Sequence, residues 1–160
     1  MSHTETIGSK GGNANFINVQ TGSTTAAFAE GAIISLDSNG YGISCATAVD
    51  IKTIGVLANG LKALDSAAQR NLSVQTSGIV KLYGWKDSTT GYQTSIVPGE
   101  RVMVGDDSDS AYTGQVVVHA DAAATTTSDF NTDGRKPIGI ALDAMSTAGT
   151  RTAINVLLTL

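Results

Sequence analysis

From residue 31 onward, the sequence consists of short runs of β-forming residues separated by turns. Short strands that recur about every ten residues are typical of a β-sandwich or a small barrel. The clearest turn is Asn39-Gly40, which lies between two apolar runs and predicts a β-hairpin. At the C-terminus, Ile154, Val156 and Leu158 alternate with other residues and predict a strand that is paired within a sheet. We therefore expect residues 31–160 to form a compact antiparallel all-β domain.

The first 30 residues have a different character. Residues 8–13 and 21–25 are rich in Gly, Ser, Thr and Asn, as flexible linkers are, and between them Phe16, Ile17 and Val19 form a short apolar patch. Alone, such a segment cannot bury enough apolar surface to offset the entropy lost on ordering. We predict an extended, flexible N-terminal arm over residues 1–30, mobile or ordered against another chain. Phe16, Ile17 and Val19 are its candidate partner contacts.

Composition limits the class of partner. The 160 residues suit one domain, and the formal net charge is −4 with no run of Lys or Arg. Nucleic acids and anionic membranes are bound through clustered cations, so we expect neither as a partner. The sequence has no apolar run near the roughly 18 residues of a membrane span and no signal-peptide pattern, so we expect synthesis in a cytosol.

The residues do not suggest catalysis. The nucleophile-elbow motif Gly-x-Ser-x-Gly, the zinc motif His-Glu-x-x-His and the pair Cys-x-x-Cys are all absent. The single Cys45 alternates with Tyr41 and Ile43, which predicts a small buried apolar side chain rather than a reactive thiol. We therefore expect a protein that is not an enzyme and has no catalytic residues or bound cofactor.

One loop has side chains in the order of a metal site. Asp129, Asn131 and Asp133 stand at alternate positions before Gly134, as in the first half of a calcium loop. The twelfth position is Ile140, where such a loop needs a bidentate Glu. The sequence favours a polar turn whose side chains bind their own backbone, with a structural calcium ion as the alternative.

A short pattern occurs twice. In its first copy, Ile54-Gly55-Val56 is followed by an Ala-containing loop, by Arg70 and by an alternating apolar pair. In its second copy, Ile138-Gly139-Ile140 is followed by a similar loop, by Arg151 and by another such pair. Each Gly is expected where a neighbouring backbone or bulky side chain comes close. The pattern predicts two similar hairpins on opposite sides of one core, with chance similarity as the alternative.

Several of these segments together resemble the capsid decoration, or cement, proteins of tailed bacteriophages. The resemblance covers about residues 30–160 and rests on short Gly-plus-aliphatic words that follow a polar Gly/Thr arm. These are Glu30–Ile34, Ile54–Val56, Ser77–Val80, Pro98–Val102 and Pro137–Leu142, followed by a C-terminal strand.

The resemblance implies a non-enzymatic homotrimer that binds the major capsid protein on the outer surface of the virion. It would be synthesised in the host cytoplasm and would stabilise the head by clamping adjacent capsomers. The alternative is a carbohydrate- or receptor-binding head-fibre or spike module, with calcium as an optional component, in which Tyr83, Trp85 and Tyr92 would stack on sugars.

Overall fold

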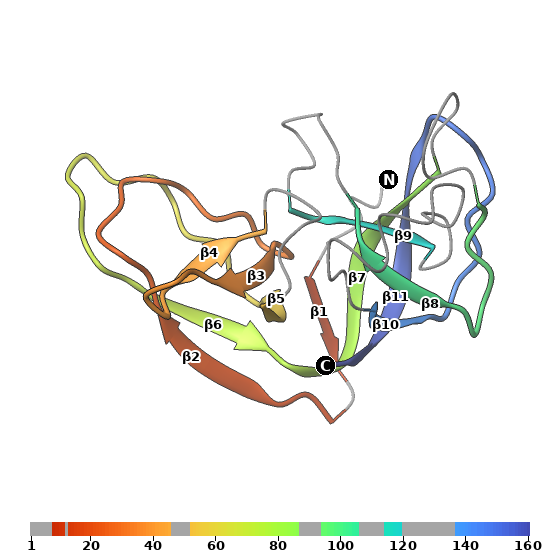
Figure 1. The fold of residues 1–160 in the computed structure, drawn as a ribbon, viewed down its shortest axis with the longest axis horizontal. Helices are drawn as coiled ribbons and strands as arrows, with labels where there is room; N and C mark the ends of the chain where they lie inside the picture. The colour runs from red at the N-terminus through yellow and green to blue at the C-terminus, as the bar shows by residue number, and fades with distance from the viewer. Residues whose placement is uncertain (1–7, 12, 46–51, 87–93, 106–113, 120–136) are drawn as a thin grey trace, which may run out of the picture.

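The computed structural model describes residues 8–11, 13–45, 52–86, 94–105, 114–119 and 137–160 (Figure 1). These residues contain strands and connecting segments but no helix, so the predicted all-β class is confirmed. The strands are β1 (Gly8–Gly11), β2 (Phe16–Gln20), β3 (Ile33–Leu36), β4 (Gly42–Ser44), β5 (Thr53–Leu57), β6 (Asn71–Gln75), β7 (Ser77–Trp85), β8 (Arg101–Val104), β9 (Val116–His119), β10 (Pro137–Ala141) and β11 (Arg151–Thr159).

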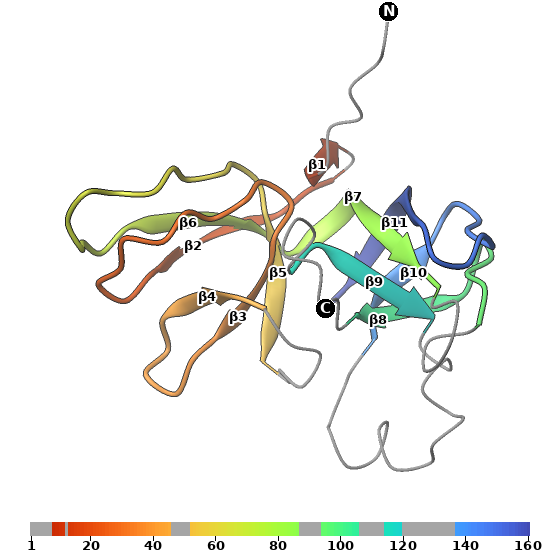
Figure 2. The same cartoon turned by 90° about the horizontal axis from the view of Figure 1, so that it is seen from above.

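One sheet closes on itself, and we call it the barrel sheet. Its pairings run β7–β11–β10–β8–β9, and β9 then pairs with β7 at Tyr83 and Gly84. The β7–β9 pair is parallel, whereas the other pairs are antiparallel. β1 pairs with the earlier part of β7, on the edge that β9 leaves free. The barrel strands surround a common interior in Figure 2.

The other sheet has the order β2–β6–β5–β3–β4, and we call it the open sheet. It is antiparallel throughout, and its end strands β2 and β4 each pair with one neighbour. Only Thr76 separates β6 from β7, so the chain passes almost directly from the open sheet into the barrel (Figure 1).

Two apolar clusters form the core. One fills the barrel and includes Ile33 and Val56 of the open sheet, while the other lies on the opposite face of that sheet with Ile34 and Leu57. Strands β3 and β5 are thus buried on both faces, so a one-residue slip would exchange the side chains of the two clusters. Cys45 is 2% exposed in the first cluster, which confirms that it is buried.

The local turns follow the sequence. Asp37 Oδ1 accepts hydrogen bonds from the backbone N–H groups of Asn39 and Tyr41, and Gly40 has a φ of 81°. The β3–β4 hairpin predicted from Asn39-Gly40 is therefore present, with Gly at a position that strongly favours it. Residues 61–70 form a wide loop between β5 and β6.

The N-terminal segment differs from the predicted flexible arm. Its described residues include β1, paired with β7, and β2, paired with β6 over all five residues. Further on, Thr24 pairs with Ala68 and Phe28 with Leu61. Local composition missed this because the ordering comes from strands more than 50 residues away along the chain. The domain division at residue 30 stays a prediction.

Candidate functional site

Strand β2 exposes two large apolar side chains at the end of the open sheet. Phe16 is 49% exposed and Ile17 is 43% exposed. Val19 packs partly buried against the cluster that contains Leu72 and Val74 of β6. Of the three predicted contact residues, Phe16 and Ile17 are thus exposed, whereas the structure turns Val19 toward the core. Phe16 and Ile17 remain the candidate contact residues.

Within the described residues, β2 pairs along one edge only, with β6. Thr21 N–H donates to Arg70 O and Thr76 N–H donates to Asn15 O, so the odd-numbered residues direct their backbone groups toward β6. Because hydrogen-bonded and non-hydrogen-bonded pairs alternate in an antiparallel ladder, the groups of Phe16, Asn18 and Gln20 point away from β6. Two apolar side chains thus flank a row of backbone donors and acceptors that faces away from the sheet.

The Asp129–Gly134 loop, with the metal candidates Asp129, Asn131 and Asp133, lies outside the described residues. Within the described part of the chain, no three His, Cys, Asp or Glu side chains are grouped so that they could hold a metal ion.

The aromatic residues of β7 lie on the outer side of the barrel. Val80 and Leu82 are buried, whereas the alternating Tyr83 and Trp85 are half-buried. The guanidinium carbon of Arg151 lies 5.3 Å from the centre of the Trp85 ring. A cation over this ring occupies a surface on which a sugar would otherwise stack. Tyr92 lies outside the described residues.

A polar contact joins the end of β9 to the turn before β8. His119 Nε2 lies 2.9 Å from Glu100 Oε2, and the same oxygen accepts a hydrogen bond from Val97 N–H at 2.9 Å. His119 is buried at the end of β9, and it is opposite Val102 in the β8–β9 pair. The contact ties the Val97–Glu100 turn to the barrel at the end of β9.

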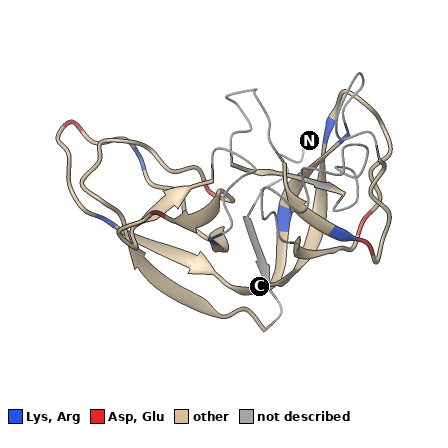
Figure 3. Ribbon diagram, in the orientation of Figure 1, with Lys and Arg blue, Asp and Glu red and all other residues tan. Residues whose placement is uncertain are grey.

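Charge does not gather on any one described surface. The Lys and Arg positions are scattered along the ribbon of both sheets and their loops, and the Asp and Glu positions are scattered as well (Figure 3). This distribution offers no basic track for a phosphate backbone. In the described ranges there is also no helix long and apolar enough to cross a membrane.

No protein-family model matches this chain, and no curated protein matches it.

Proposed function

We propose that this protein is a non-enzymatic capsid decoration protein that binds the major capsid protein on the outside of a phage head. The observation that supports this most is the unprotected edge of β2. Soluble proteins usually protect an exposed edge strand with Lys, Pro or a bulge, because a free edge invites pairing with another chain. β2 reads Phe-Ile-Asn-Val-Gln, without charge or proline, and pairs with β6 in unbroken register.

Such an edge is suited to β-augmentation, in which an extended partner segment adds as a further strand. Phe16 and Ile17 would contact the capsid protein on opposite faces of that added strand, and the backbone groups of Phe16, Asn18 and Gln20 would pair with it. We further propose a homotrimer on the capsid lattice, where many weak contacts stabilise the head through multivalency.

The test uses heads of the phage that encodes this chain, prepared without the protein. The wild-type protein should co-sediment with expanded heads at saturating occupancy, whereas Asn18→Pro should bind weakly. Proline at residue 18 removes a backbone N–H that points away from β6, so the fold is retained. The control is Thr152→Ala, at an exposed position of β11 in the barrel sheet, and it should bind like wild type.

Failure of the wild-type protein to sediment with expanded heads would contradict the proposal. Light scattering gives the oligomeric state independently, and a strict monomer at all concentrations would contradict the trimer. Deleting residues 1–20 is a less clean experiment, because the deletion removes strands from both sheets.

A further inference from the structure

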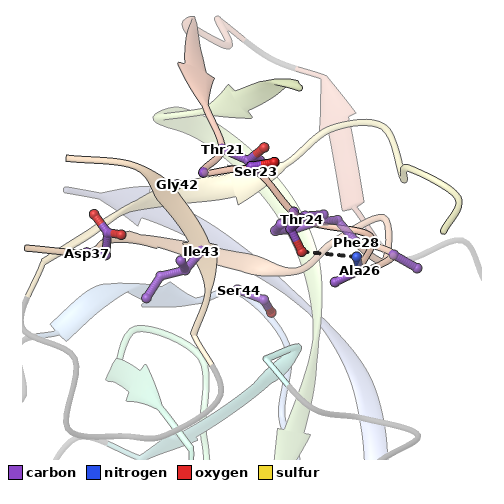
Figure 4. A pocket seen from close by; sticks show the side chains of 11 residues that line it. Thr21, Ser23, Thr24, Ala26, Phe28, Asp37, Gly42, Ile43 and Ser44 are labelled. Carbon is purple, nitrogen blue, oxygen red and sulfur yellow. Dashed lines mark hydrogen bonds between the residues drawn. The ribbon is translucent and has the colours of Figure 1, made fainter. Parts of the chain in front are cut away.

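Within the described part of the chain, the open sheet has a second free edge at β4, which pairs with β3 alone, and a groove runs beside it (Figure 4). The groove has a volume of about 370 Å³. One wall is β4 itself, from Gly42 to Ser44, and the other is the segment from Thr21 to Phe28. The first wall is a strand and the second is the segment that follows β2, and the two meet only in the folded chain.

The β4 wall offers backbone hydrogen bonds. Asp37 N–H donates to Tyr41 O and Cys45 N–H donates to Ile33 O, which sets the pairing of β4 with β3. The intervening Ile43 pairs with Ser35, so the backbone groups of Gly42 and Ser44 point away from β3. Two residues in the same orientation on one strand match the repeat of an extended peptide.

The opposite wall offers apolar surface rather than hydrogen bonds. The backbones of Thr24 and Phe28 are already paired with Ala68 and Leu61. Ala26 and Ala27 are exposed, and on the β4 side Ile43 is 38% exposed. The lining includes one carboxylate, Asp37, and no basic side chain. The groove therefore suits an extended segment with apolar side chains and no negative charge.

We propose that this groove receives an extended segment of a capsid subunit, which adds to β4 as a further strand. The inference rests on the proposed function and completes it, because a protein that clamps two capsomers needs two separate contacts, here β2 and the β4 groove. Strand β2 of a second copy would enter as part of a sheet, because it is already paired with β6, whereas the groove between β4 and the Thr21–Phe28 segment suits a single extended segment.

Two groove variants test the proposal against the phage heads described above. Ser44→Pro removes an N–H that points into the groove, and Ile43→Lys places a charge at an exposed position of its lining. Each should weaken binding to heads by about tenfold, as the loss of a hydrogen bond or an apolar contact predicts. Thr152→Lys carries the same new charge on the barrel sheet and should bind like wild type. Thermal melting verifies that all three variants are folded.

The outcomes are distinct. If wild type binds heads and both folded groove variants bind equally well, the groove proposal is overturned while the proposed function stands. If the groove variants instead dissociate an oligomer of the free protein without affecting head binding, the occupant is a second copy, and the proposal is likewise wrong. If wild type itself does not bind heads, both proposals fail.

Discussion

The hairpins β5–β6 and β10–β11 carry the same local pattern in two different sheets. A Cβ on Gly139 would lie 2.5 Å from the Leu157 carbonyl oxygen and 2.6 Å from Val156 Cγ1. A Cβ on Gly55 would lie 2.6 Å from Val74 Cγ1 and closer still to the carbonyl oxygen of the next residue, Gln75. Both glycines therefore admit the neighbouring strand at close range, which confirms the reason predicted for them.

The two arginines of the repeated pattern also act alike. Arg70 has its guanidinium carbon 5.5 Å from the centre of the Phe28 ring, and Arg151 lies 5.3 Å from that of Trp85. Arg70 directly precedes β6 and Arg151 begins β11, so each arginine lies where the second strand of its hairpin starts, and each covers an aromatic ring from another part of the chain. The repeated pattern is thus matched by repeated geometry.

The surroundings of the two hairpins differ. Beyond β10, strands β8 and β9 continue the sheet until β9 reaches β7 and closes the barrel. Beyond β5, the sheet continues through β3 to the three-residue β4 and ends there, which leaves β2 and β4 as edges. Two similar hairpins therefore do not determine closure, which depends on the strands added next. Among the described strands, the open sheet ends in β2 and β4, whereas β7 to β11 close and only β1 adds an edge to the barrel sheet.

Proline substitutions should give the largest difference in stability between the closed barrel sheet and the edge of the open sheet. In the barrel sheet, Leu142 N–H donates to Asn155 O, so Leu157 directs its N–H toward β10. Leu157→Pro should destabilise the fold by at least about 3 kcal/mol, because it removes a ladder hydrogen bond in a strand paired on both sides. In β2, Ile17→Pro should be costly in the same way, whereas Asn18→Pro should cost less than about 1 kcal/mol.

Urea unfolding measures these differences. Equal destabilisation by Ile17→Pro and Asn18→Pro would show that both backbone directions of β2 are paired, and the open edge would then be wrong.

Alanine at the two matched glycines should have similar, large effects. Gly55→Ala and Gly139→Ala each place a methyl group against a neighbouring carbonyl and a valine, and each should cost about 3 kcal/mol through strand displacement. Thr152→Ala, at an exposed position, serves as the control. A cost at one glycine and none at the other, measured by thermal unfolding, would show that the two hairpins are not equivalent.

The elements that could be predicted are those that depend on neighbouring residues in the sequence. The β3–β4 hairpin and β11 follow from turn chemistry and alternation, and both are confirmed. Strands β1 and β2 were not predicted as parts of the sheets, because Gly8 pairs with Lys81 and Phe16 with Gln75, far along the chain. Polar, Gly-rich composition does not indicate such distant partners.

The candidate site was predictable only in part. The apolar patch of Phe16, Ile17 and Val19 was visible in the sequence, but which of these side chains stay exposed depends on the pairing of β2 with β6. The groove at β4 had no sequence signal, since Thr21–Phe28 and Gly42–Ser44 are brought together by the fold.

Substitution of Arg70 should have a smaller effect on the stability of the fold. Its Nη1 donates to Lys62 O at 2.6 Å and its Nη2 donates to Ala26 O. Arg70→Met should cost about 2 kcal/mol, because it removes charged hydrogen bonds and the contact with Phe28. Arg70→Lys should restore little, since one ammonium cannot reproduce the planar fork. Full stability of Arg70→Lys in urea unfolding would contradict this role.

Hydrogen exchange with and without expanded heads is the most direct test of partner binding through the open sheet. In the free protein, the amides of Phe16 and Asn18 should exchange faster than that of Ile17. Binding to heads should slow exchange in β2, at Phe16 and Asn18, and leave exchange in β11 unchanged. Unchanged exchange throughout β2 on heads that carry the protein would contradict the account.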